Sequence, residues 1–324
     1  MDTYTIAGSG LVVSRIAYGC MKIGGSPGTR VFTDSERNAV GKLITTACEQ
    51  GITLIDHADI YAHGNSERIF GEAMRDLPSL RDRITLQSKC GIWHKDDPNP
   101  GDPARYDFSY GHLVSSVEGS LKRLNTDRLD ILLLHRPDPL GEPEEVARAF
   151  DELHASGKVI NFGVSNHMPL QIELLKKYVK QPLIVNQLEL NILHSYLIDD
   201  GVMANHVNER YTAASGILDY CKLQGILVQA WAPVAQGRLT GVPGLTDERE
   251  RAAAELVARI AKEKGTSADA IALAWLLKHP TPVQPIIGTT KPDRIISSCE
   301  ADRVELTREE WYSLFVAARG SRMP

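Results

Sequence analysis

Four polar residues, Asp56, His57, Asp59 and Tyr61, follow a mostly apolar run at residues 52–55. The run is typical of a buried strand, and a hydrophobic core does not readily accommodate so many polar groups. In an α/β barrel the catalytic groups lie at the carboxyl ends of the strands. The segment therefore predicts a chemical site at a strand end. A strand that simply leads into a solvated polar loop is the alternative.

Other predicted strands also end in polar or aromatic side chains. In chain order these are Lys89, His135, Ser165, Asn166, Gln187 and Trp231. One such residue alone would have a structural explanation, because a lysine at a strand end is usually solvated and a histidine is commonly a hydrogen-bonded core residue. Since the parallel strands of a barrel end on one face, the set as a whole predicts side chains that converge.

An alternation of strands and helices must place these residues, and the hydrophobic pattern provides it. Strands are expected at residues 15–18, 52–55, 84–88, 129–134, 160–164, 183–186, 226–230 and 283–287. Helices are expected at residues 34–50, 67–76, 110–124, 144–156, 169–178, 214–223, 249–264 and 268–278. Apolar strands that alternate with helices in eight units predict a closed (β/α)8 TIM barrel.

The pattern adds elements before and after these units. Residues 4–6 and 11–13 flank glycines and predict a small N-terminal β-hairpin. Residues 293–298 and 307–318 predict extra C-terminal helices after the last strand. Because no linker, composition break or repeat interrupts the sequence, we expect residues 1–324 to form a single domain.

Two connections, residues 91–108 and 189–212, are longer than the usual loop between a strand and its helix. Long loops at the carboxyl face of a barrel usually line a pocket or cover it. A disordered surface insertion is the alternative for the second connection, which is polar. We expect Met21, Trp93 and Tyr106 to line an apolar pocket at this face.

Composition excludes several classes of protein. The 324 residues carry a net charge of −5 without a long basic run, so a nucleic-acid-binding surface is not expected. The five cysteines form no Cys-x-x-Cys pair, which indicates reduced thiols. The first residues do not resemble a leader peptide, and no apolar run has membrane-spanning length. We therefore expect a soluble, cytoplasmic protein that does not bind membranes.

Five motifs occur in a fixed order along nearly the whole chain. They are Asp56-x4-Tyr61, Gln-Ser-Lys89-Cys-Gly, Leu-Leu-Leu-His135-Arg-Pro-Asp, Gly163-Val-Ser-Asn166 and Gly288-Thr-Thr-Lys-Pro-Asp-Arg294. In order and spacing they resemble the aldo-keto reductase family, and within it the bacterial oxidoreductases of YdhF type. The resemblance implies an eight-stranded α/β barrel, in agreement with the independent count of strands. It also implies reduction of an aldehyde or ketone by hydride transfer from NADPH.

The resemblance further implies a catalytic tetrad of Asp56, Tyr61, Lys89 and His135, with Tyr61 as the proton donor. A free phenol has a pKa near 10, so donation near neutral pH requires this pKa to fall by roughly two to three units. An ammonium about 4 Å away supplies roughly 4 kcal/mol at an effective dielectric constant near 20, so Lys89 alone could suffice. Asp56 would keep Lys89 charged, and a neutral His135 would hydrogen-bond the carbonyl oxygen.

The resemblance assigns contacts with the NADPH/NADP+ cofactor to Gly19, Cys20, Met21, Asp56, Ser165, Asn166, Gln187, Trp231, Ala232, Pro233, Gln236, Gly237, Arg238, Gly288, Thr289, Thr290 and Arg294. The polar groups of residues 165, 166 and 187 would satisfy the nicotinamide carboxamide, and the indole of residue 231 would stack on the ring. Gly237 would let the backbone approach the pyrophosphate. Arg294, assisted by Lys291, would bind the 2′-phosphate and favour NADPH over NADH.

Some features depart from the family pattern or leave alternatives open. Ser297 and Ser298 stand where many relatives carry Glu-Asn, so no residue is assigned to the adenine. A nicotinamide-binding sensor or regulatory subunit on the same fold is the first alternative function. The second is a metal-dependent hydrolase, whose candidate ligands are His57, Asp59, His63 and His135. A monomer is expected, and the apolar pocket makes aromatic or aliphatic carbonyl compounds the candidate substrates.

Overall fold

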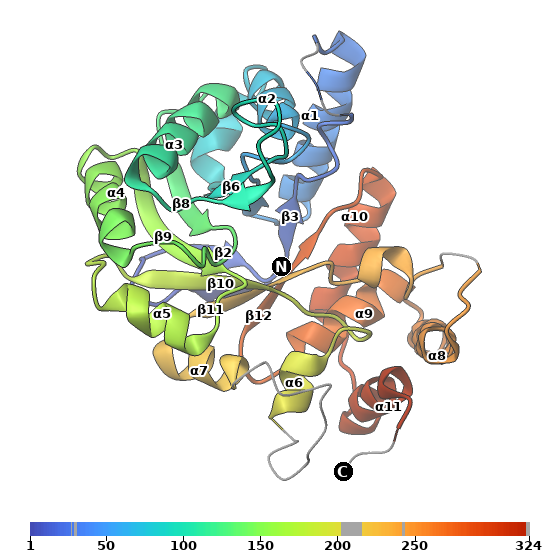
Figure 1. Ribbon diagram of the computed structural model, residues 1–324. Helices are drawn as coiled ribbons and strands as arrows, with labels where there is room; N and C mark the ends of the chain where they lie inside the picture. Colours follow the sequence, from blue (N-terminus) through green and yellow to red (C-terminus); the bar gives the residue numbers. More distant parts are fainter. Residues whose placement is uncertain (27, 29–30, 202–215, 242–243, 322–324) are drawn as a thin grey trace.

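Eight parallel strands close into a barrel in the computed structural model, which describes residues 1–26, 28, 31–201, 216–241 and 244–321 (Figure 1). The strands are β3 (Ala17–Gly19), β4 (Leu54–Asp56), β5 (Thr85–Cys90), β8 (Leu129–Leu134), β9 (Val159–Ser165), β10 (Leu183–Glu189), β11 (Leu227–Trp231) and β12 (Val283–Ile287). Each pairs with its neighbour in chain order, and β12 pairs back to β3 at Ile286 and Ala17. The predicted (β/α)8 barrel is confirmed.

Helices surround the barrel and cover the outer faces of its strands (Figure 1). They are α1 (Asp34–Glu49), α2 (Asn65–Met74), α3 (Tyr110–Leu124), α4 (Pro143–Ala155), α5 (Pro169–Lys176), α7 (Ile217–Gln224), α8 (Glu248–Lys264), α9 (Ala268–Leu277), α10 (Pro292–Cys299) and α11 (Arg308–Arg319). Helix α1 begins at a capping box in which Thr33 and Glu36 satisfy each other's backbone N–H groups. The first residues of the predicted helix 214–223 lie outside the described residues. Among the described residues, no helix combines the length and the hydropathy needed to cross a bilayer.

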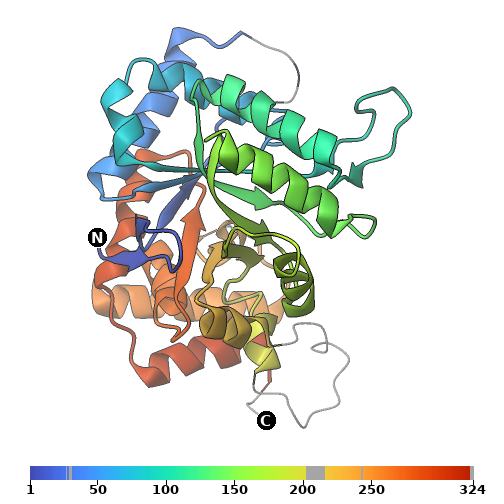
Figure 2. The same cartoon turned by 90° about the vertical axis from the view of Figure 1, so that its left-hand side faces the viewer.

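The N-terminal hairpin closes one end of the barrel, as expected. Strands β1 (Thr3–Thr5) and β2 (Val12–Ser14) pair antiparallel, and the turn between them uses glycines at positive φ, 75° at Gly8 and 70° at Gly10. Apolar side chains of the hairpin join the cluster inside the barrel, which includes Ile6, Val13, Leu54, Ile131, Leu133 and Val185. Figure 2 shows the hairpin on the side of the molecule opposite the extension that follows β5.

The two long connections contain short elements that the sequence pattern did not reveal. In residues 91–108, β6 (Ile92–Trp93) and β7 (Arg105–Tyr106) form a two-stranded antiparallel sheet. In residues 189–212, α6 (Tyr196–Asp200) forms one helical turn, and residues 202–212 lie outside the described residues. Three 3₁₀ turns complete the elements: Pro78–Arg83, Ala235–Gly237 and Glu300–Arg303.

The C-terminal helix α11 packs against α8, and a pair of tryptophans connects it to α9. The rings of Trp275 and Trp311 stack with centroids 5.0 Å apart and planes 7° from parallel. Each indole N–H donates to the main-chain oxygen of the other residue, at 3.1 and 2.9 Å. Buried indoles usually find such a partner, and here the two satisfy each other. The reciprocal contact attaches α11 to the barrel layer.

Candidate active site

One face of the molecule collects residues from all eight barrel strands, because the strands are parallel and end together. Gly19, Asp56, Lys89, Ser165, Gln187 and Trp231 lie in the last part of a strand, and His135 and Gly288 directly follow one. Backbone pairing sets their register. Gly19 lies opposite Asp56, and the N–H of Cys20 donates to the main-chain oxygen of Asp56 at 2.9 Å. The convergence predicted from the sequence is therefore observed.

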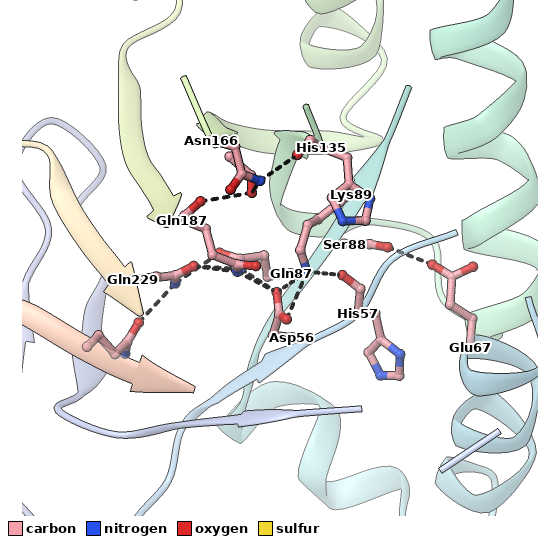
Figure 3. Close-up of polar contacts among 12 residues, drawn as sticks. Asp56, His57, Glu67, Gln87, Ser88, Lys89, His135, Asn166, Gln187 and Gln229 are labelled. Atoms are coloured by element: carbon pink, nitrogen blue, oxygen red, sulfur yellow. Dashed lines mark hydrogen bonds and ion pairs between the residues drawn. The ribbon is translucent and has the colours of Figure 1, made fainter. Parts of the chain in front are cut away.

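A buried ion pair forms the centre of this face (Figure 3). Lys89 Nζ donates to both oxygens of Asp56, at 2.7 and 2.8 Å, and to the main-chain oxygen of His57 at 2.6 Å. Burial opposes the charged ammonium, but the attraction of Asp56 and Tyr61 outweighs it and raises the pKa of Lys89 above its ordinary value. The lysine is therefore a fixed, fully buried cation at neutral pH.

Tyr61 lies next to this cation, with Lys89 Nζ 5.0 Å from the centre of the phenol ring. The expectation that Lys89 alone brings the phenol close to neutral titration is wrong. Burial of the phenol raises the pKa of Tyr61 above 10, and the opposing effect of Lys89 is partly cancelled by Asp56. The phenol therefore carries its proton throughout the physiological pH range, which is the form needed for a proton donor.

His135 faces the phenol from the end of β8, with the two ring centroids 6.0 Å apart at 81°. Burial, with a further effect of Lys89, lowers the pKa of His135 well below its ordinary value. The imidazole is thus neutral, as expected from the sequence. Its Nδ1 atom is buried and has no hydrogen-bond partner within the described part of the chain. A neutral imidazole beside the tyrosine can donate one hydrogen bond to a carbonyl oxygen.

Three polar side chains next to His135 form a connected group. Ser165 Oγ donates to the main-chain oxygen of Gln187 at 2.9 Å, and Asn166 Nδ2 donates to Ser165 Oγ at 2.8 Å. Asn166 Oδ1 accepts the indole N–H of Trp231 at 3.2 Å. Asn166 has a φ of 62°, a left-handed conformation that asparagine tolerates better than most residues. The group links the ends of β9, β10 and β11.

A family model for the aldo/keto reductases matches residues 15–315. The chain belongs to the aldo-keto reductase family. Two known relatives resemble the chain in sequence over most of their length. The chain is 36% identical over 315 residues to a 6-dehydroglucose reductase of Agrobacterium fabrum, covering 97% of each chain. It is 36% identical over 277 residues to oxidoreductase YdhF of Escherichia coli, covering 85% of each chain.

A solved structure supports the same conclusion about the fold of this chain. The glycerol dehydrogenase of Gluconobacter oxydans matches with a TM-score of 0.81 and 26% identity, covering 98% of this chain and 94% of that one. The resemblance inferred from the five motifs, including the likeness to YdhF, is confirmed. Carbonyl reduction with a nicotinamide cofactor is the general activity of the aldo-keto reductase family, and this chain has the corresponding barrel.

The loop after β11 has a backbone suited to a phosphate group. Ala232, Ala235 and Gln236 have φ angles of 51°, 50° and 58°, and Gly237 has 94°. Left-handed conformations of this kind at non-glycine residues cost of order 1–3 kcal/mol each and cluster at ligand clamps. Mixed right- and left-handed residues also turn main-chain N–H groups toward one side, where an anion can bind. The left-handed residues make this loop a candidate for holding an anionic group, although the N–H groups of Ala235, Gly237 and Arg238 already donate to main-chain oxygens within the loop.

The two arginines that the sequence assigns to the cofactor have acidic partners. Arg294 donates to Asp269 through Nε at 3.2 Å and Nη2 at 2.6 Å, and to Thr240 Oγ1 at 2.9 Å. Arg238 forms an ion pair with Glu250. A cavity of about 470 Å³ opens beside them, lined in part by Arg238 and Thr240. The carboxylates reduce the net positive charge that this end of the site offers to a phosphate.

The extension formed by β6 and β7 contacts the segment that follows β4. His94 Nε2 lies 3.1 Å from the main-chain oxygen of Ile60, and the His94 ring stacks on His63 with centroids 3.8 Å apart. The extension therefore borders the same face as the ion pair and the tyrosine.

The three residues expected to line an apolar pocket have mixed surroundings. Trp93 is half-buried, and its indole N–H donates to Asp107 at 2.9 Å while Arg105 lies 5.2 Å from the ring. Tyr106 is 41% exposed and Met21 62% exposed. The surroundings of Trp93 combine aromatic rings with charged and polar groups. They do not form a purely apolar surface.

The residues proposed for a hydrolytic metal site do not form one. Among the described residues, no group of three or more histidine, cysteine, aspartate or glutamate side chains is arranged to hold a metal ion. His57 is fully buried against Phe70, with centroids 4.6 Å apart, and burial lowers its pKa to about 3. His63 stacks on His94 at the surface. The hydrolase hypothesis is therefore left without a ligand set in this part of the chain.

Sequence reasoning missed three glutamines inside the barrel, Gln87, Gln229 and Gln284. All three are fully buried and hydrogen-bonded to one another or to neighbouring strands. A signal was present, since Gln87 lies two residues before Lys89 and residues two apart share one face of a strand. An amide on the same face as a predicted catalytic lysine therefore indicates a polar barrel interior.

Asp59 is a second, half-buried acid two residues before Tyr61, separate from the central ion pair. Its Oδ1 atom is buried and has no hydrogen-bond partner among the described residues. Burial, reinforced by the negative charge of Glu67, raises the pKa of Asp59 from 3.8 to about 8, although Arg123 opposes the shift. The carboxyl group is therefore mostly protonated at neutral pH.

This shift predicts a dependence of stability on pH. Between pH 4 and pH 8 the folded chain holds a proton on Asp59 that the unfolded chain has released, so stability falls as the pH rises, by up to about 1.4 kcal/mol per unit. Asp59→Asn keeps a neutral side chain at every pH and should flatten this slope. Urea unfolding of both proteins at pH 5, 6, 7 and 8 measures it. Parallel slopes in the two proteins would contradict the shifted pKa.

Proposed function

We propose that the chain reduces an aldehyde or ketone to the alcohol with NADPH. The observation that supports this most is the buried Asp56–Lys89 pair beside a protonated Tyr61, at the carboxyl face of a barrel in a carbonyl-reducing family. When bound, NADPH supplies the hydride that reaches the carbonyl carbon.

The chain's own residues would manage the charge on the carbonyl oxygen. Tyr61 donates its proton to this oxygen as negative charge develops there, and the neutral His135 stabilises the same charge by a hydrogen bond. Lys89 then stabilises the phenolate left on Tyr61, since the ammonium lies against the ring. Asp56 holds Lys89 in place through two hydrogen bonds. The result is a proton donor that works without a strongly lowered pKa in its resting form.

The residues that would hold NADPH lie around the same face. Ser165, Asn166 and Gln187 suit the carboxamide of the nicotinamide, and Trp231 offers an aromatic face beside them. The left-handed loop at residues 232–237 suits the pyrophosphate. Gly19 ends β3, Cys20 and Met21 follow it, and Pro233 lies in the loop itself. The loop after β12, with Gly288, Thr289, Thr290 and Arg294, would receive the 2′-phosphate.

For the substrate, we propose a hydroxylated carbonyl compound such as an oxidised sugar. Relatives at 36% and 34% identity are 6-dehydroglucose reductases. The segment with Trp93, His94 and Arg105 borders the same face and brings polar groups that suit a hydroxylated compound. Its aromatic rings are stacked on other side chains of the protein, so the polar groups carry this proposal. Simple aromatic and aliphatic carbonyls form the comparison class.

A substrate panel tests the reaction and the substrate class together. We expect NADPH oxidation with 6-dehydroglucose at a kcat/KM at least about tenfold above that of benzaldehyde or butanal, a difference of about 1.4 kcal/mol in transition-state binding. Single-turnover oxidation of bound NADPH separates a reductase from a sensor. Binding of NADPH without oxidation by any carbonyl would favour the sensor alternative. Equal rates on all carbonyls would remove the proposed preference for sugars.

We also propose that the chain is a monomeric, cytoplasmic protein folded as one domain. These expectations come from the composition and from the continuous alternation of strands and helices. Size-exclusion chromatography with light scattering measures the oligomeric state, and a mass near 36 kDa is expected from the 35.7 kDa chain.

A further inference from the structure

Four buried glutamines form a continuous chain of hydrogen bonds inside the barrel (Figure 3). Gln87 Nε2 and Gln187 Nε2 both donate to Asp56 Oδ1, at 2.6 and 3.0 Å, and both also donate to Gln229 Oε1, at 2.9 and 3.0 Å. Gln229 Nε2 donates to Gln87 Oε1 at 3.1 Å and to Gln284 Oε1 at 2.9 Å. None of the four is more than 2% exposed.

The glutamine chain ends, at the side farthest from Asp56, on a main-chain carbonyl oxygen. Gln284 Nε2 donates at 2.6 Å to the main-chain oxygen of Ser14, which lies in strand β2 of the hairpin that closes the barrel. A carbonyl oxygen can only accept, so Gln284 must turn its nitrogen toward it and its oxygen toward Gln229. Gln229 must then present its nitrogen to Gln284, while its oxygen accepts from Gln87 and Gln187. One fixed acceptor thus sets the direction of every amide in the chain.

The near end of the chain is the carboxylate of the central ion pair. Asp56 Oδ1 accepts from Lys89 at 2.7 Å, from Gln87 at 2.6 Å and from Gln187 at 3.0 Å, while Oδ2 accepts from Lys89 at 2.8 Å. If either amide were reversed, its oxygen would face the carboxylate and repel it. The direction of the chain therefore decides whether Asp56 meets donors or acceptors.

We infer that this glutamine chain, Gln87, Gln187, Gln229 and Gln284, positions the Asp56–Lys89 pair for proton transfer by Tyr61. The inference rests on the proposed function, because the pair matters only if Tyr61 donates a proton. The chain keeps the carboxylate surrounded by N–H donors, and the carboxylate in turn holds the ammonium against the phenol. Gln87, Gln229 and Gln284 are thus positioning residues, acting on the reaction through Asp56.

Two methionine substitutions test the chain at its two ends. Methionine is unbranched and close to glutamine in size, but its thioether cannot replace the amide. In Gln87→Met the carboxylate loses one donor, so kcat for carbonyl reduction should fall roughly tenfold. The pH profile of kcat should shift as well, because a carboxylate with one donor fewer holds the ammonium less firmly against the phenol. Gln284→Met should move it in the same direction by less, although residue 284 does not touch Asp56.

Asn186→Leu is the matched control for loss of a buried amide. Asn186 is fully buried, and its Nδ2 donates to the main-chain oxygen of His167 at 2.9 Å. This hydrogen bond does not belong to the glutamine chain. We expect all three variants to lose thermal stability, but only the two methionine variants to shift the pH profile. The inference is overturned if the folded methionine variants keep the wild-type pH profile, or if the control shifts it equally.

A second measurement keeps the inference separate from the proposed function. Failure of the proposed function would appear as a wild-type protein that reduces no carbonyl compound. In that case the ¹⁵N chemical shift of Lys89 Nζ, followed by NMR across pH, still reports on the pair. We expect the shift of this signal to change in Gln87→Met and Gln284→Met but not in Asn186→Leu. An unchanged Lys89 signal in both methionine variants would overturn the inference.

Discussion

Tyr61→Phe should lower kcat for carbonyl reduction by roughly 10²–10⁴-fold, the usual contribution of a positioned general acid. Phenylalanine keeps the ring against Lys89 but has no proton to donate to the carbonyl oxygen. Since the hydroxyl is the only group removed, the affinity for NADPH should stay within about threefold of the wild type. Steady-state kinetics at pH 7 and isothermal titration calorimetry with NADPH provide the two measurements.

The structure also predicts how the activity of the wild-type protein depends on pH. Burial raises the pKa of Tyr61, so the wild-type phenol stays protonated through neutral pH and the activity of the protein should not fall until the solution is clearly alkaline.

Tyr312→Phe, a change on the partly exposed face of α11, serves as the control for Tyr61→Phe and should leave kcat unaltered. If Tyr61→Phe retained more than about a tenth of the wild-type rate, another group would be the proton donor.

Arg294→Ala should weaken NADPH binding by roughly 10- to 100-fold and change NADH binding little, because a charge-assisted contact contributes about 1.5–3 kcal/mol. The guanidinium is already held by two hydrogen bonds to Asp269 and one to Thr240, so it is ordered before a phosphate arrives. Calorimetric titration with both cofactors gives the ratio of the two dissociation constants. Equal wild-type affinities for NADPH and NADH would contradict the assignment of Arg294 to the 2′-phosphate.

Asp269→Asn should change the same ratio in the opposite direction. The carboxylate neutralises part of the charge on Arg294 and would repel a 2′-phosphate, so its removal should strengthen NADPH binding severalfold. Asparagine keeps the size of the side chain and can still accept a hydrogen bond. A weaker preference for NADPH in this variant would show that Asp269 acts mainly by ordering the arginine.

The fold was predictable because its elements depend on local patterns. Residues 129–134 and 283–287 are mostly apolar, and the strands observed there have the predicted bounds. Capping residues such as Thr33 mark helix starts directly. The pair β6 and β7 was not predictable, because two-residue strands contain no alternation and three prolines separate them. Their pairing depends on contacts with the loop after β4, which no local pattern reveals.

The candidate site was predictable in its positions but not in its energetics. Asp56 and Lys89 could be placed at neighbouring strand ends, and their ion pair follows from the parallel register. The pKa of Tyr61 could not be obtained in the same way. It depends on how much water the folded chain removes from the phenol and on how far Asp56 cancels the charge of Lys89. The acidic partner of Arg294 was also missed, because Asp269 lies on a different helix.

The stacked pair of Trp275 and Trp311 separates the intrinsic fluorescence of the protein into two reporters. The chain has four tryptophans, and the other two, Trp93 and Trp231, lie at the candidate site. Emission from the stacked pair should respond to undocking of the C-terminal helix, whereas quenching by a bound nicotinamide should affect Trp231 first. In Trp231→Phe the remaining emission should respond mainly to unfolding. In Trp311→Phe it should respond mainly to binding of the ligand.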